Sequence, residues 1–140
     1  MDQNPYEGTW EGELQYQKGG GLYNPDWPPD VWRLTIKDNA ARVFIKRDAA
    51  EDFKESKPGK YKMEIYMTNV LIFAITSGGD EDGVWVETQT FVLTQKGPDT
   101  LGAILAGAVN NTEQPLDRET SKFFYLGTGE LLRTGLAMGP

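Results

Sequence analysis

The chain has 140 residues, enough to bury a core, and we expect one domain over residues 1–140. Its net charge of −7 argues against nucleic acid and anionic membranes as partners, because both attract clusters of Lys and Arg. Cys and His are both absent. Their absence excludes Cys nucleophiles, triads that contain His, His-ligated haem and the usual zinc sites. We therefore expect no metal and no other cofactor.

The N-terminus carries neither a basic region nor an apolar run, so no signal peptide is predicted. The longest apolar run, Val70–Ile75, is too short to span a bilayer. We therefore expect a cytoplasmic protein.

Alternation of apolar and polar residues with a period of two recurs along the chain and predicts half-buried β-strands. In the first strand, Trp10, Leu14 and Tyr16 share one face, and Glu11 and Glu13 share the other. Residues 17–30 contain three consecutive glycines and three prolines, so a loop is expected there. The alternation returns at residues 32–36 and 43–45, which predicts the second and third strands.

The polar segment 47–57 is expected to form either a short surface helix, with Phe53 turned inward, or a loop. Further strands are expected at residues 61–68, 70–75, 84–94, 101–109 and 122–134, the last one bulged at Gly127 and Gly129. The result is about eight strands joined mostly by short turns, without the helices that parallel sheets require. This pattern predicts an all-β, antiparallel fold, either an up-and-down barrel or a sandwich.

The first and last predicted strands carry residues that suit a contact between them. Gly8-Thr9-Trp10 opens the first strand, and Arg133 lies in the last. A guanidinium over an indole face stabilises a fold by roughly 0.5–2 kcal/mol. These residues and the strand order resemble the lipocalin and calycin superfamily, whose members carry a G-x-W motif on the first strand and an Arg on the last. The resemblance implies an up-and-down barrel of about eight strands, open at one end, that holds a small apolar ligand.

The strand at residues 84–93 has two different faces, and either can point inward. If Trp85, Glu87 and Gln89 point inward, Glu87 and Gln89 are the few polar groups of an apolar cavity, and Glu87 is a candidate acid or base. If the face of Val84 and Val86 points inward, Glu87 and Gln89 lie in water. The cost of burying an unpaired carboxylate favours the second orientation.

Aromatic and polar side chains on the predicted strands are the candidates for a ligand-binding wall. They are Trp32, Tyr66, Trp85, Glu87, Gln89 and Tyr125. Tyr23 and Trp27 lie in the loop rich in Gly and Pro, either as a lid over the barrel mouth or as anchors of the loop on the rim, the interpretation that we favour. The small residues of 101–109 either border a cavity or let the sheet bend.

We expect the chain to bind a small, mostly apolar molecule. One alternative is a barrel enzyme (an isomerase, cyclase or lyase) that uses Glu87, although the pattern identifies no catalytic residue. The other is a non-catalytic homo-oligomeric interaction module, because Val70–Ile75 is apolar on both faces and leaves one face for a second copy. In that case Phe53 must not cover this face. The acidic loop Asp80–Gly83 lacks the spacing of a calcium loop and is expected to be a solvated hairpin tip.

Overall fold

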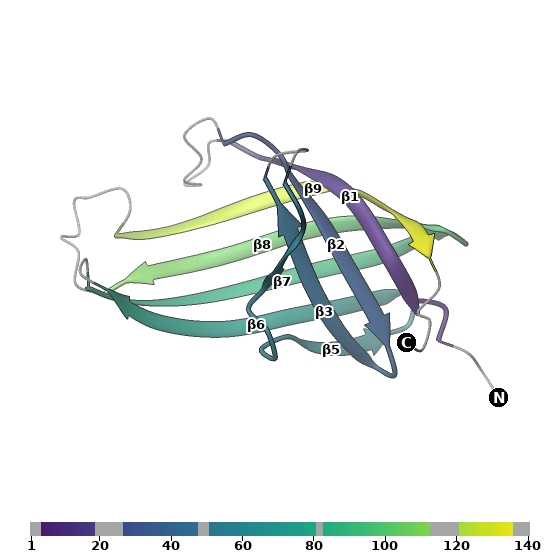
Figure 1. Ribbon diagram of the computed structural model, residues 1–140, viewed down its shortest axis with the longest axis horizontal. Helices are drawn as coiled ribbons and strands as arrows, with labels where there is room; N and C mark the ends of the chain where they lie inside the picture. Colours follow the sequence, from purple (N-terminus) through teal and green to yellow (C-terminus); the bar gives the residue numbers. More distant parts are fainter. Residues whose placement is uncertain (1–3, 19–26, 48–50, 81–82, 113–120, 136–140) are drawn as a thin grey trace.

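The computed structural model describes residues 4–18, 27–47, 51–80, 83–112 and 121–135, apart from the side chain of Asp80. Within these ranges the chain forms nine β-strands (Figure 1). They are β1 (Gly8–Tyr16), β2 (Asp30–Lys37), β3 (Ala40–Lys46), β4 (Lys54–Ser56), β5 (Lys62–Tyr66), β6 (Asn69–Asp80), β7 (Gly83–Gly97), β8 (Thr100–Asn111) and β9 (Lys122–Gly135). No helix in these ranges has the length and apolar character needed to cross a membrane.

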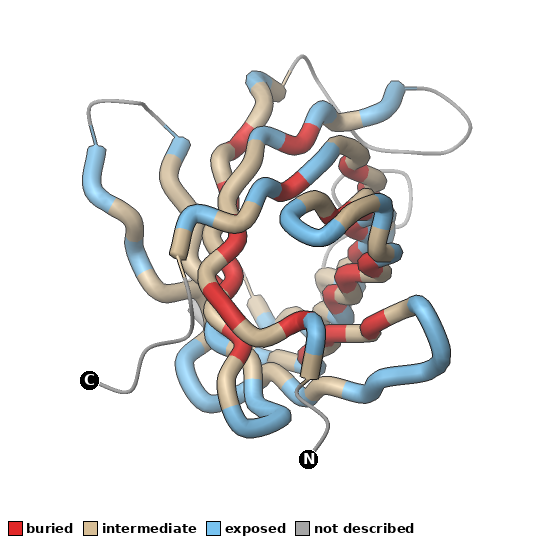
Figure 2. Tube along the Cα trace, turned by 90° about the vertical axis from the view of Figure 1, so that its right-hand side faces the viewer, coloured by how far each residue is buried: buried red, intermediate tan, exposed pale blue. Residues whose placement is uncertain are grey.

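All nine strands belong to one antiparallel sheet, in the order β4-β3-β2-β1-β9-β8-β7-β6-β5. The first and last strands pair in the middle of this order, and the two edges are β4 and β5, which follow one another in the chain. The sheet is strongly curled, so that β1–β3 run across β6–β9 at a steep angle (Figure 1). Seen from the side, the chain winds around a central axis, and the buried residues lie along its inner wall (Figure 2).

The prediction of a closed barrel of eight strands is therefore corrected to an open half-barrel of nine. The gap, which we call the seam, lies between β4 and β5, where no backbone ladder joins the two edges. The polar segment before the seam contributes only three residues of strand, Lys54–Ser56, and then turns at Lys57 and Gly59, which both have positive φ. So short a strand offers too few backbone groups to complete the ladder.

In β1 and β2 the predicted apolar faces point inward, and this part of the prediction is confirmed. In β2 every second residue is buried, from Asp30 to Ile36. The apolar residues of the inner face form one core. Its fully buried members include Trp10, Leu14, Leu34, Ile36, Val43, Val70, Ile72, Phe91, Leu93, Leu101, Leu105 and Leu131.

Two glycines allow β1 and β9 to approach closely. A Cβ atom on Gly12 would lie 2.0 Å from the carbonyl oxygen of Glu130, and one on Gly129 would lie 2.4 Å from that of Glu13. No other residue fits at either position without moving a backbone. The predicted bulge at Gly127 and Gly129 is wrong, because the pairing with β1 is regular there and shifts only between Thr9 and Trp10.

Arg133 fastens the end of the half-barrel at which the chain enters β1. Its guanidinium lies 4.2 Å from the centre of the fully buried Trp10 ring, as predicted. It also donates hydrogen bonds to three backbone carbonyl oxygens, those of Glu7, Pro5 (2.9 Å) and Pro98 (3.0 Å). One side chain therefore joins β9 to the segment before β1 and to the turn before β8. We call this group of contacts the clasp.

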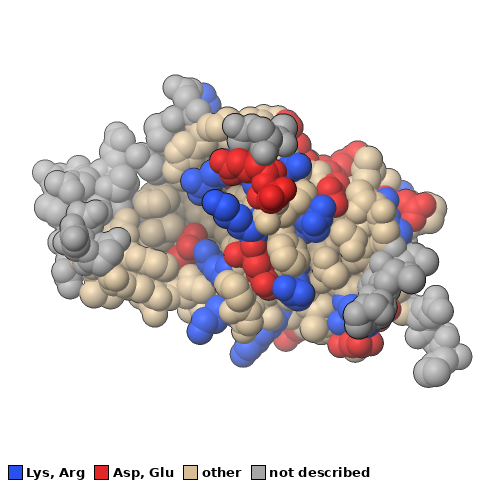
Figure 3. All heavy atoms as spheres, viewed as in Figure 1, with Lys and Arg blue, Asp and Glu red and all other residues tan. Residues whose placement is uncertain are grey.

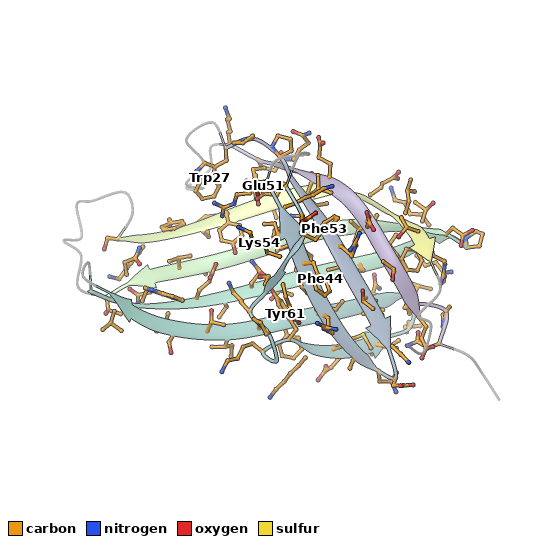
Figure 4. All side chains as sticks on the ribbon, viewed as in Figure 1. Trp27, Phe44, Glu51, Phe53, Lys54 and Tyr61 are labelled. Carbon is orange, nitrogen blue, oxygen red and sulfur yellow. The ribbon has the colours of Figure 1, made fainter. Side chains whose placement is uncertain are left out.

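Phe53 lies in a loop on the outer side of the sheet, so the alternative of a short helix with Phe53 turned inward is wrong. The guanidinium of Arg33 in β2 lies 4.1 Å from its ring centre, and the ammonium of Lys46 in β3 lies 4.7 Å from it (Figure 4). These two cations cover the ring and hold it over β2 and β3. Phe53 therefore does not cover the outer face of β6, where Ile75 remains 68% exposed.

Replacing Arg133 tests how far the fold depends on the clasp. Arg133→Met keeps an apolar side chain over Trp10 but removes the charge and the hydrogen bonds. We expect the free energy of unfolding, measured by urea denaturation, to fall by about 2–4 kcal/mol. Arg42→Met is the control, because Arg42 pairs with Glu55 on the outer surface, is 64% exposed and should change stability little. Equal urea midpoints for Arg133→Met and the wild type would contradict a structural role for the clasp.

Candidate functional site

The concave side of the sheet encloses a cavity of about 450 Å³. It lies towards the end of β1 and the start of β2, at the opposite end of these strands from the clasp. Its volume is within the range of small-molecule sites. On the surface, acidic and basic side chains gather over β2–β4, and mainly uncharged side chains cover the neighbouring ends of β6–β8 (Figure 3).

Four of the six predicted wall residues line this cavity: Trp32, Glu87, Gln89 and Tyr125. They come from β2, β7 and β9, so only the curling of the sheet brings them together. Trp27, predicted from the loop rich in Gly and Pro, also lines it.

The remaining predictions fall elsewhere. Trp85 belongs to the inner face of β7 but packs on Gly78, where a Cβ atom would lie 2.6 Å from the indole ring, and it does not line the cavity. Tyr66 is 71% exposed at the end of β5, so its placement in the wall is wrong. It ends an edge strand that has a neighbour on one side only. Tyr23 and residues 81–82 of the acidic loop lie outside the described residues.

The face of β7 that carries Glu87 and Gln89 points inward. The cost of burying an unpaired carboxylate favoured the opposite orientation, with Val84 and Val86 inward, so that expectation is wrong. Val86, on the other face, is 39% exposed. The physical reason is that Glu87 is not unpaired. The ammonium of Lys57 lies 2.9 Å from its Oε1, and the hydroxyl of Tyr125 donates a hydrogen bond of 2.8 Å to its Oε2. A paired and hydrogen-bonded carboxylate is far less costly to bury.

A chain of hydrogen bonds continues from Glu87 across the seam. The amide of Gln89 donates to the hydroxyl of Tyr125 at 2.9 Å and accepts from the hydroxyl of Tyr61. The hydroxyl of Ser56, in β4, lies 3.2 Å from that of Tyr61 and donates to it, because the Tyr61 proton is already used. Side chains therefore join β4 to β7 and β9 where the backbone ladder is missing. Figure 4 shows Tyr61 in this region.

Aromatic rings form the wall on the other side of the cavity. Tyr16, Trp27 and Tyr125 meet edge to face, with ring centres 5.6–6.4 Å apart. The hydroxyl of Tyr16 donates to the buried carboxylate of Asp30, and the guanidinium of Arg47 lies 3.9 Å from the same carboxylate. These contacts agree with Trp27 as an anchor on the rim.

Burial keeps the phenols of the site protonated. It raises the pKa of Tyr16 and Tyr125 far above the usual value, and the neighbouring carboxylates add to the effect. Burial raises the pKa of Tyr61 to about 12; the hydrogen bond from Ser56 opposes the shift and the charge of Glu87 adds to it. At neutral pH all three hydroxyls are hydrogen-bond donors.

Gly107 in β8 makes room for Tyr125. A Cβ atom at this position would lie 2.1 Å from Cζ of the Tyr125 ring. On the same strand, Val109 lines the cavity, whereas Ala106 and Ala108 are exposed. The small residues of 101–109 therefore border the site at Gly107, by allowing a neighbouring ring to lie across the strand.

Several residues of the site escaped the sequence analysis. Tyr16 and Asp30 carried a signal in the alternation. Tyr16 is two residues after the inward-facing Leu14, and Asp30 is two residues before the inward-facing Trp32. Tyr61 began the predicted strand at 61–68, but nothing in the sequence linked it or Lys57 to the site. Both lie beside the turn between β4 and β5, and only the curling of the sheet places them against β7.

Replacing Tyr61 by Phe tests the pKa shift at the seam. Between pH 10 and 12, tyrosines of the unfolded chain lose their protons while Tyr61 of the folded chain keeps its own. The unfolded state then binds fewer protons, so the free energy of unfolding falls as the pH rises. We expect urea denaturation at pH 9 and pH 11.5 to show a smaller fall for Tyr61→Phe than for the wild type. Tyr66→Phe, at an exposed position, is the control and should match the wild type; equal falls in all three proteins would contradict the shift.

Replacing Gly107 tests whether Tyr125 needs the space above β8. Gly107→Ala must displace the ring or the backbone, and we expect a loss of about 1–3 kcal/mol in the free energy of unfolding. Gly102→Ala on the same strand is the control, because the new methyl group would meet only the flexible end of Lys96, at 3.0 Å. If both variants unfold at the same temperature, Gly107 has no such role.

Comparisons with protein-family models, with curated proteins and with solved structures find no match to this chain. The lipocalin resemblance therefore rests on Gly8, Trp10 and Arg133 and on the curled antiparallel sheet. In the described part of the chain, no group of three or more His, Cys, Asp or Glu side chains could hold a metal ion.

Proposed function

We propose that this chain binds a small, mostly apolar molecule in the cavity of the half-barrel. The observation that carries the proposal is a cavity of about 450 Å³ with aromatic walls, whose polar groups are largely paired with one another. A site of this kind offers apolar contact area and few polar groups, which is the usual composition of small-molecule sites.

The charges around the cavity support an apolar ligand. Lys57 pairs with Glu87, and Arg47 lies beside Asp30, so each carboxylate has a cation next to it. The remaining lining includes uncharged side chains such as those of Trp27, Ile45 and Val109. Burying apolar ligand surface against such walls stabilises the complex by roughly 25 cal/mol per Å² before the costs of association.

The lipocalin-like interpretation fits the same arrangement. The clasp at Trp10 and Arg133 lies at one end of the half-barrel, and the cavity lies towards the other. The resemblance implies a barrel that is open at one end and holds a small apolar ligand, and the proposed function places the ligand in the cavity.

The catalytic alternative is less well supported than binding. Both oxygens of Glu87 are engaged, Oε1 by Lys57 and Oε2 by Tyr125. A carboxylate that acts as a base needs a free oxygen within reach of the substrate proton. Glu87 must first lose one of these partners, whereas a binding function uses the cavity as it stands.

The interaction module is favoured by a different surface, the convex face of β6–β9. Ile75, Thr88, Ala108 and Phe124 form one uncharged row across the four strands. Ile75 is 68% exposed and Phe124 46% exposed, so both ends of this row present a large apolar side chain to solvent. A homodimer through this face is compatible with a ligand in the cavity, because the two surfaces lie on opposite sides of the sheet. Sedimentation analysis should then detect a dimer.

Filling the cavity tests the proposed function. Val109→Trp places a large ring among the lining residues, and Val92→Trp places the same ring on the outer face of the neighbouring strand. Titration calorimetry with indane, a compact bicyclic hydrocarbon, should show binding by the wild type and by Val92→Trp. We expect the dissociation constant to rise more than tenfold for Val109→Trp, because the ring occupies the site.

The melting temperatures of both variants control for misfolding. The proposal fails if the wild type binds neither indane nor its ketone and amine derivatives, or if Val109→Trp and Val92→Trp bind indane equally well.

A further inference from the structure

The outer side of the sheet has two halves of different character. Over β1–β4 it is charged (Figure 3), and the charges pair across neighbouring strands, Arg33 with Glu11 and Arg42 with Glu55. The guanidinium of Arg42 also lies 5.1 Å from the ring centre of Phe44, one of the aromatic side chains labelled in Figure 4. This half has the polar character that is usual for the solvent side of an antiparallel sheet.

The convex face of β6–β9 carries no charge over three complete rows of side chains. In each row the register places one residue from each of the four strands side by side. The rows, which we call the uncharged patch, are Leu71-Val92-Ile104-Thr128, Phe73-Thr90-Ala106-Leu126 and Ile75-Thr88-Ala108-Phe124. Because 25% of the residues of the chain are charged, about three of these twelve positions would be charged at the average composition.

Charged side chains return at both ends of the uncharged patch. Glu130 lies in the next row at one end and forms an ion pair of 3.3 Å with Lys96. Lys122 lies in the next row at the other end. An uncharged centre with a charged rim is the usual arrangement of a protein–protein interface.

Exposed apolar side chains are concentrated on this convex face. The described part of the chain has nine large apolar residues that are exposed, and five of them lie here. They are Ile75, Val84, Val86, Ile104 and Phe124. Val84 and Val86 continue the face along β7, beyond the patch. A contiguous apolar surface of this kind marks an interaction site.

The relief of the patch is complementary to itself. In the two rows nearest Phe124, β6 and β9 carry the large side chains, whereas β7 and β8 carry only Thr and Ala. A shallow trough, formed by Thr88, Thr90, Ala106 and Ala108, therefore lies beside a ridge formed by Phe124 and Leu126. Two copies related by a two-fold axis can each place the ridge in the trough of the other.

The size of the face suits a dimer at the lower limit of stable interfaces. From the spacing of strands and of residues along them, the patch and the next row at Val86 span roughly 19 Å by 27 Å, or roughly 500 Å². Two such faces in contact bury roughly 1,000 Å² in total, which is about the minimum for a specific interface. No charge of the patch has to lose its water when the faces meet.

We infer that the occupant of this face is the same face of a second copy of the chain. The two sheets pack face to face, and Phe124 of each copy lies over Ala106 and Ala108 of the other. The inference specifies how two copies of the interaction module meet. It does not depend on a ligand, because the cavity lies on the opposite side of the sheet.

One charge in the trough tests the inference. Ala108→Lys places an ammonium at the centre of the contact, and Ala40→Lys places the same group on the charged half of the outer face; both alanines are exposed in the single chain. Lys is chosen because it lowers the net negative charge of the chain, so a loss of association cannot come from repulsion between acidic copies.

Sedimentation equilibrium over a series of concentrations measures the association. We expect a dissociation constant in the micromolar range for the wild type and for Ala40→Lys, as suits an interface of this size. For Ala108→Lys we expect it to rise at least tenfold, because the ammonium loses its water against apolar side chains.

A measurement on the wild type makes the test independent of how well Ala108→Lys folds. The methyl signals of Ala106 and Ala108 in a ¹³C–¹H spectrum should change on dilution through the same range of concentrations. The methyl signal of Ala40, outside the contact, should stay unchanged.

Each outcome decides the inference. A wild type that stays monomeric up to the highest concentration, or trough signals that do not change on dilution, overturn it and leave the ligand proposal standing. A dimer that persists in Ala108→Lys overturns it too, because another surface must then hold the copies together, and so does an equal loss in Ala40→Lys. The expected pattern in a protein that binds no indane supports the dimer and removes the proposed function of the cavity.

Discussion

The pairing of β1 with β9, fastened by Arg133 over Trp10, is the constraint on which the rest of the structure depends. It brings the two ends of the sheet-forming chain together in the middle of the strand order. The two edges of the sheet must then come from the middle of the chain and lie close to one another. Gly12 and Gly129 allow the close approach that this pairing requires, because any side chain there would meet the opposite backbone.

The open seam that results determines the chemistry of the cavity. Since β4 and β5 share no backbone ladder, hydrogen bonds between side chains connect the two halves of the sheet there, from Ser56 through Tyr61 to Gln89. The same side chains form one wall of the cavity or lie directly behind it. Their donors and acceptors are therefore used for the structure before a ligand arrives.

The alternating pattern was sufficient to predict most strands and the inward residues of β1 and β2. The contact between Trp10 and Arg133 was predicted from the places of these two residues in the first and last strands. The pattern failed where the structure of a segment depends on residues that are distant in the sequence. The segment 47–57 is too polar to resemble a strand, yet Lys54–Ser56 pair with β3, a partner that the local pattern does not show. The inward orientation of Glu87 conflicts with the cost of burying an unpaired charge. Lys57, from the turn after β4, removes the conflict because it pairs with Glu87.

What the sequence determined by itself was most of the strands, the residues that share each face, and the exclusion of chemistry that needs Cys or His. What only the tertiary structure decided was which face of β7 points inward and where the sheet stays open. The physical reason is that a period of two is identical for both faces of a strand, so it carries no information about which one is buried. That choice depends on side chains such as Lys57 and Tyr61, which reach the site only after the sheet has curled.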